Sequence, residues 1–190
     1  MAQYKVAYPY VAAIKTEPEA AAATYEKGLE LGKMIDVEVT PNFSETPLYG
    51  NNGLAEYAKE FKDLDVTLNT TTLPIEAFSM LFGQTVENEN KAVKANVNDI
   101  APYVGFGFVK GEMVNNVTTY VAVWIPKVKF APPAEKCTTK GDSITWNTPS
   151  LTGKGTADNA GDWRDMEIFD TEKEALAYIK AKFTPDELGG

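Results

Sequence analysis

The sequence contains no histidine, and this absence removes several kinds of chemistry at once. Histidine is the most frequent general base in enzymes, the usual partner of a serine or cysteine nucleophile and the commonest zinc ligand. Ser-His-Asp and Cys-His arrangements are therefore excluded, and most hydrolase classes with them. We expect a protein that is not an enzyme and that has no catalytic residues, no metal site and no cofactor.

Cysteine is almost as scarce, because Cys137 is the single thiol in 190 residues. One thiol cannot close a disulfide within the chain, so the protein either stays in a reducing compartment or does not rely on cross-links. We expect Cys137 to be buried or chemically neutral rather than a reactive nucleophile.

Long apolar runs are also missing. The longest strongly apolar run, residues 120–125, is far shorter than the roughly 20 residues that a membrane helix needs. The first residues are mixed in character up to Lys15, without the apolar stretch of a signal peptide. We expect a soluble protein that is made without export and that does not enter a membrane.

Basic residues are in the minority, with 18 Lys and Arg against 27 Asp and Glu, a net charge of -9. Such a surface repels phosphate backbones, so tight binding of nucleic acid is disfavoured. The 44% of hydrophobic residues can fill a core without help from a metal or a disulfide. The length then predicts one domain over residues 1–190.

Alternation of polar and apolar residues dominates the middle of the chain. The clearest case is residues 63–69, with one apolar and one polar face, which predicts a half-buried strand. The apolar face has Leu64, Val66 and Leu68, and the polar face has Asp63, Asp65, Thr67 and Asn69. Residues 117–125 are apolar on both faces, so we expect a strand that is covered on both sides. Further strands are predicted at residues 33–40, 91–95, 103–109, 127–131 and 142–148.

Two helices interrupt this pattern. The first follows Pro74 and ends at Gly83, with an expected buried face of Ile75, Phe78 and Phe82. The second begins with a capping box formed by Thr171 and Glu174 and is expected to bury Leu176, Ile179 and Phe183. Residues 20–23 are expected to form a loop. The fold class is therefore mainly β, an antiparallel sandwich or barrel with one inserted helix and one C-terminal helix.

Three groups of residues invite a chemical interpretation. Asp63 and Asp65 would share a strand face at about 7 Å, near the separation of the two carboxylates in glycosidases, but no cleft signature accompanies them. We favour a wet acidic face, and a glycosidase stays the least favoured alternative. A second group, Asp158, Asp162 and Asp165, lacks the spacing of a calcium loop and is expected to lie on a solvated loop.

The third group is Gly105 and Gly107, which alternate within an expected strand instead of preceding a helix. This spacing is not that of a phosphate-binding loop. It indicates strand positions against which another backbone or a bulky ring packs closely.

The order of these features along the chain resembles the major tail protein family of long-tailed phages that infect Gram-positive bacteria, whose members are tail tube subunits. The features that carry the resemblance are the turn at residues 48–53, the acidic strand at 63–68, the helix start at 73–76, the helix end at 81–83, and the runs at 98–108 and 139–149. Together they cover about residues 33–151.

The resemblance implies a β-sandwich whose inner sheet joins those of its neighbours into a closed barrel in a ring of six, with rings stacked into a hollow tube. It implies that Asp63, Asp65, Thr67 and Asn69 face the lumen, where carboxylates let double-stranded DNA slide past without specific binding. The implied partners are further copies of the chain, the tape measure protein, the tail terminator and the distal tail protein. The implied location is the virion tail, and the host cytoplasm during assembly.

Residues 45–61 are long for a hairpin connection and rich in glycine and asparagine. We expect a loop that contacts the next ring, because it carries apolar residues that are costly to leave in water. The residues expected in this contact are Leu48, Tyr49, Asn51, Asn52, Leu54 and Tyr57. The alternative is that the loop folds back on its own domain. The alternative function is a β-sandwich that binds a carbohydrate or a protein through Tyr120, Trp146 or Trp163.

Overall fold

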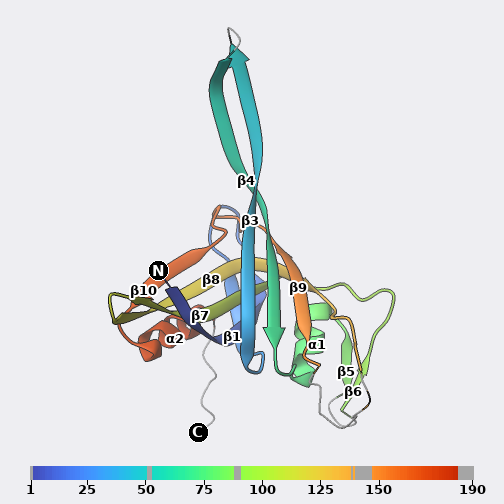
Figure 1. Ribbon diagram of the computed structural model, residues 1–190. Coiled ribbons are helices and arrows are strands. Elements are labelled where there is room, and N and C mark those ends of the chain that lie inside the picture. The colour runs from blue at the N-terminus through green and yellow to red at the C-terminus, as the bar shows by residue number, and fades with distance from the viewer. Residues whose placement is uncertain (1, 51–52, 88–90, 138, 140–146, 184–190) are drawn as a thin grey trace.

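The computed structural model describes residues 2–50, 53–87, 91–137, 139 and 147–183, and the chain is mainly antiparallel β with two helices in these ranges (Figure 1). This confirms the predicted fold class, with one helix inserted between strands and one near the C-terminus. The elements are β1 (Ala2–Thr16), β2 (Thr24–Glu30), β3 (Met34–Gly50), β4 (Gly53–Thr70), α1 (Ile75–Phe82), β5 (Thr85–Glu87), β6 (Ala92–Lys94), β7 (Val104–Val114), β8 (Val117–Ala131), β9 (Ser150–Gly155), β10 (Asp165–Phe169) and α2 (Glu172–Ala181).

One large sheet follows the order β2-β1-β7-β8-β9-β4-β3, with β10 added beside β8, while β5 and β6 form a separate hairpin. Strand β8 has a different neighbour along each part of its length. Its first half pairs with β10, from Tyr120 to Trp124, and its last residues pair with β9, from Val128 to Ala131. The sheet therefore divides at β8 into two layers, one of β3, β4, β9 and the end of β8, and one of β2, β1, β7, β10 and the start of β8.

The first core lies between these layers. Alternation in β4 places Leu64, Val66 and Leu68 in it, where they meet residues of β1, β7, β8 and β9. Helix α1 closes one side of this core. It begins after Pro74 and ends at Gly83, whose φ of 70° is the left-handed conformation that glycine adopts without strain. The helix bounds are as predicted, but its buried residues are Ala77, Leu81 and Phe82, and Ile75 and Phe78 are only partly buried.

The second core lies on the other face of β1, β7 and β8, where α2 packs. The hydroxyl of Thr171 accepts a hydrogen bond from the backbone N–H of Glu174 at 3.3 Å, as the capping box predicts. Ala175 and Ile179 are the buried residues of α2, and Leu176 is only partly buried. The core is built by Ala12, Tyr25, Val109, Ala122, Trp124, Ala175 and Ile179.

The strands predicted from the sequence begin at residue 33, so β1 and β2, which lie before it, were not found. Val11 and Ala12 are both fully buried, so β1 is covered on both faces and shows no alternation. A shift in its pairing with β7 between Ala7 and Tyr10 breaks the period further. The loop at residues 20–23 is confirmed.

Residues 117–131 form one strand where two were predicted. Pro126 has no N–H to donate, and it lies where the pairing of β7 with β8 shifts between Val104 and Phe106, so the strand passes through it. Residues 142–146 of the predicted strand at 142–148 lie outside the described residues. Cys137 was expected to be buried or neutral, and it is exposed after the end of β8.

Candidate functional site

The layer of β3, β4 and β9 turns one polar face outward, away from the first core. On β4 this face carries Asp63, Asp65, Thr67 and Asn69, because their neighbours Leu64, Val66 and Leu68 point into the core. Their partners across β3 are Asn42, Thr40, Glu38 and Asp36, and those across β9 are Lys154, Thr152 and Ser150. We call this surface the polar face.

Asp63 and Asp65 are held together by two residues of the neighbouring strands. The Asn42 side-chain amide donates to Oδ1 of Asp63 at 2.6 Å and to Oδ2 of Asp65 at 2.7 Å. The Lys154 ammonium lies 2.8 Å from Asp65 and 3.5 Å from Asp63. The hydrogen bond from Asn42 lowers the pKa of Asp63, and the bond from Lys154 followed by that from Asn42 lowers the pKa of Asp65.

This arrangement favours two charged carboxylates and argues against a glycosidase. Such an enzyme needs one carboxyl group whose pKa is raised, so that it can donate a proton at neutral pH. Both groups here are shifted the other way, and both are reached by solvent. The pair is suited to present negative charge rather than to transfer a proton.

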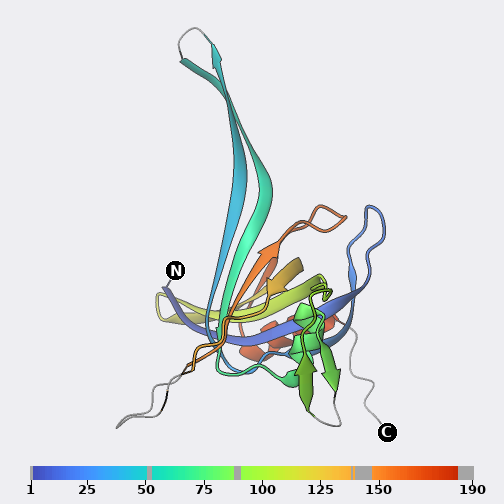
Figure 2. The same ribbon diagram turned by 90° about the vertical axis from the view of Figure 1, so that its right-hand side faces the viewer.

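Beyond the body of the protein, β3 and β4 continue as a long hairpin, which we call the arm, from Phe43 to Phe61 (Figures 1 and 2). Their pairing runs from Met34 opposite Thr70 out to Gly50 opposite Gly53. The expected loop at residues 45–61 is therefore a pair of strands. Register shifts next to Asn42 and Leu48 break the alternation that would have revealed them.

The arm points away from the body in both views, so it does not fold back on its own domain (Figures 1 and 2). Four of the six residues expected in the contact with the next ring lie on its strands near the far end: Leu48, Tyr49, Leu54 and Tyr57. Asn51 and Asn52 lie outside the described residues.

A cluster of aromatic rings holds the base of the arm. Phe61 stacks on Trp163 with ring centroids 4.8 Å apart, and Phe43 meets Phe61 edge-on at 6.2 Å. The Arg164 guanidinium lies 4.6 Å from the centre of the Trp163 ring, and Lys59 lies over Phe43 at 4.7 Å. Sequence reasoning considered Trp163 only as a ligand-binding aromatic. Its ring instead makes contacts within the chain, and nothing in the sequence pairs it with Phe61.

Apolar side chains are exposed on the second layer. Met166 and Ile168 of β10 are 48% and 63% exposed, and Val117 at the start of β8 is 62% exposed. The register places Ile168 opposite Val121 and Met166 opposite Val123, whose side chains belong to the first core. The apolar side of this layer is therefore covered by the core at β8 but exposed to solvent at β10.

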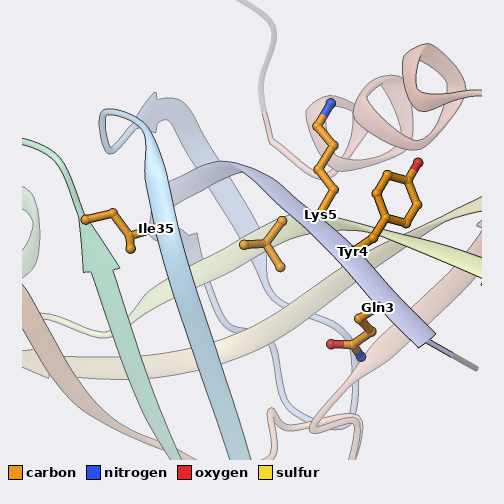
Figure 3. A pocket seen from close by; sticks show the side chains of 5 residues that line it. Gln3, Tyr4, Lys5 and Ile35 are labelled. Carbon is orange, nitrogen blue, oxygen red and sulfur yellow. The ribbon is translucent and has the colours of Figure 1, made fainter.

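The hollow in Figure 3 lies where β3 passes the N-terminal half of β1. It is lined by Gln3, Tyr4, Lys5, Val6 and Ile35. The Lys5 ammonium turns to Glu172 at 2.5 Å, which raises the pKa of Lys5 through that hydrogen bond. This lining lacks the convergent acid and base of a catalytic site.

The acidic group at residues 158–165 has a structural role. Asp158 is buried, which corrects the expected solvated loop, and its Oδ1 accepts the N–H groups of Ala160 and Asp162, each at 3.0 Å. Asp165 accepts hydrogen bonds from Tyr178 and Lys182 of the α2 region. Within the described residues no group of three or more His, Cys, Asp or Glu is placed to hold a metal ion. Neither described helix has the length and apolar character to cross a bilayer.

No protein-family model and no curated protein matches the chain. Among solved structures, the chain is similar to the tube-terminating cap of the anti-feeding prophage, determined by cryo-EM. The identity is 9%, the TM-score is 0.43, and the match covers 89% of this chain and 95% of that chain.

Proposed function

We propose that the chain is the major subunit of a phage-type tail tube. Residues 1–190 would form a single domain, six copies would join into a ring, and rings would stack into a hollow tail through which double-stranded DNA passes into the host. The arm is the observation that carries this proposal. The resemblance in residues 33–151 is the reason for proposing a tail tube rather than another kind of assembly.

A two-stranded ribbon with both faces in water is at best marginally stable. Residues 43–47 and 58–60 of the arm are exposed. At about 3.3 Å per residue, the strand from Phe43 to Gly50 reaches roughly 25 Å beyond the body. A feature of this length is expected to be covered by a partner, and in a stacked tube that partner is the neighbouring ring.

The sheet edge also supports assembly. Within the described residues β3 pairs with β4 alone, so its other edge offers unpaired backbone groups. Free edges of this kind promote association, and closure of a ring removes them. The exposed Met166 and Ile168 of β10 add apolar surface for a second copy to cover.

The polar face supplies the lumen in this proposal. Asp63 and Asp65 are charged at neutral pH, and Asn42 and Lys154 lower their pKa values further, while Thr67 and Asn69 add neutral polar groups. Such a surface repels phosphates and lets DNA slide past. The tape measure protein, the tail terminator and the distal tail protein are partners, and the virion tail is the location, that the resemblance alone implies.

The experiment that tests the proposal compares the full chain with a variant whose arm is shortened. Replacing residues 47–57 by Asn-Gly leaves Thr46 and Ala58 as a pair that closes a two-residue turn. We expect the full chain to form rings or tubes in negative-stain electron microscopy and in light scattering. We expect the variant to unfold cooperatively in urea but to form no stacked tubes.

Two results would contradict the proposal. Tubes formed by the shortened variant would show that the arm is not the stacking element. A full chain that remains monomeric at every concentration and salt condition, also in the presence of preformed tail tips, would show that the chain is not a tube subunit.

A further inference from the structure

The polar face carries opposite charges at its two sides. On β3, the strand at the edge of the sheet, Asp36 and Glu38 are both exposed. Asp36 accepts a hydrogen bond from the Asn69 amide at 2.7 Å. Neither carboxylate forms an ion pair with a lysine or arginine in the part of the chain that the structure describes.

The end of β8 carries the positive charge. Val128 and Phe130 point into the first core, so Lys127 and Lys129 extend from the same side of the layer as the polar face. Lys127 is paired with Glu17 at 2.5 Å. The Lys129 ammonium lies 4.4 Å from the centre of the Tyr103 ring and, among the described residues, meets no carboxylate.

These charges cannot meet within one copy. Strands β4 and β9 separate β3 from β8, which corresponds to roughly 14 Å at about 4.8 Å between neighbouring strands. Lys154 of β9, which lies between the two sides, already forms ion pairs with Asp65 and Asp63. Lys129 also lies directly opposite Lys154 in the register, and like charges across a strand pair are unfavourable unless each has a partner.

We propose that the acidic β3 side of one copy docks against the Lys129 side of the next copy, with Asp36 and Glu38 pairing with Lys129. This inference rests on the proposed ring, and it names the contact that joins neighbouring subunits. A second copy is the partner that the charge pattern fits, because it offers the complementary side of the same face. Contact of β3 with another β3 would bring carboxylates together, so the charge pattern disfavours a two-fold β3–β3 dimer and favours head-to-tail contacts, which form a ring when the rotation between copies closes.

The test uses charge reversal in the full chain, with Glu38→Lys, Lys129→Glu and the double variant. Each single variant gives residues 38 and 129 charges of the same sign at every contact, and we expect the concentration needed for assembly to rise by at least about tenfold. The double variant restores opposite charges with reversed sign, and we expect assembly within about threefold of the unmodified chain.

Mixing the two single variants gives a sharper readout. In a ring in which Glu38→Lys and Lys129→Glu subunits alternate, one contact joins the two introduced side chains and the next joins the two original ones. Residues 38 and 129 then have opposite charges at every contact, so an equal mixture should assemble at a concentration at which neither variant does so alone. A ring of six allows this alternation because its number of subunits is even. Lys173→Glu, an exposed charge reversal on α2, is the matched control and should leave assembly unchanged.

Urea unfolding of each variant first establishes that the monomers are folded, since both positions are on the surface. Single variants that assemble like the unmodified chain, or folded variants that neither the double substitution nor mixing rescues, overturn this inference alone. An unmodified chain that never assembles overturns the proposed function and this inference with it.

Discussion

The indole ring of Trp124 determines which residues the neighbouring strand can hold. It lies over Gly105 and Gly107 of β7, and a Cβ at Gly105 would sit 2.3 Å from Cζ2 of Trp124 and 2.6 Å from Cε1 of Tyr25. Carbon atoms that are not bonded do not approach this closely, so the strand needs glycine here for space rather than for its backbone conformation. The sequence-based interpretation of the two glycines as close-packing positions is confirmed.

We predict that Gly105→Ala destabilises the protein by about 1–3 kcal/mol, because the added methyl group overpacks the second core. The urea midpoint measures this loss. In a Trp124→Leu background the same substitution should cost less, since the indole atoms nearest to the new methyl group are gone, although Tyr25 remains. Equal costs in both backgrounds would contradict the assignment of the clash to Trp124.

Single residues also show where sequence reasoning stops. The alternation in β4 correctly placed Asp63 and Asp65 on the polar side of the strand, because the opposite side is buried. It did not find Asn42 and Lys154, which join the pair from other strands, because register across strands is not encoded in local spacing. Asp158 was missed as a buried group for a related reason, since its partners are backbone N–H groups.

At the scale of elements, the arm depends on how its base is anchored. Phe61 of β4 stacks on Trp163, which lies in the segment before β10, so the arm is tied to the second layer as well as to its own sheet. We infer that this contact restricts the direction in which the arm leaves the body. An arm that is held in one direction loses less entropy when it docks than one that swings freely.

We predict that Trp163→Ala loosens the arm while the body stays folded. Amide hydrogen exchange should become faster in residues 43–46 and 58–61, and exchange in β7 and β8 should be unchanged. Assembly should weaken, because more order must be gained on docking. Trp163→Phe, which keeps a ring for Phe61 to stack on, should lie close to the unmodified chain.

Protection that is unaltered in the arm of Trp163→Ala would show that the stacking does not anchor it. Loss of protection throughout the chain would instead show that Trp163, which also packs against the first core, stabilises the body rather than the arm.

The elements with strong local signals were the predictable ones. Helix α1 between Pro74 and Gly83 and the capping box of α2 were found because their termini are set by residues next to each other in sequence. Strands β1, β2, β5, β9 and β10 were missed. Within the described residues β9 and β10 are short and pair with distant strands, and β1 is buried on both faces, so none shows a clear alternation.

At the scale of the whole molecule, the polar face sets how an assembled tube would treat DNA. We predict that Asp63→Lys combined with Asp65→Lys leaves tubes intact, because both side chains are on the surface, but slows passage of DNA through them. Beside Lys154, the new lysines would turn an acidic region into one that attracts phosphates. The rate of DNA release from particles measures this effect, which should weaken as salt is added.

The corresponding asparagine variant, Asp63→Asn with Asp65→Asn, removes the negative charge without adding positive charge. It should lie between the unmodified chain and the lysine variant. Release rates that are the same in all three proteins would contradict the placement of this face in the lumen.

The strand order also determines which strands can pair first while the chain is being synthesised. Ala2 pairs with Met113 and Leu68 with Leu151, whereas β3 and β4 are joined by a two-residue connection and can pair as soon as both are made. Because distant pairings form slowly, the arm hairpin can close while β1 still waits for β7 to leave the ribosome. In the proposed tube, the segment that meets the neighbouring ring can therefore form before the body that orients it.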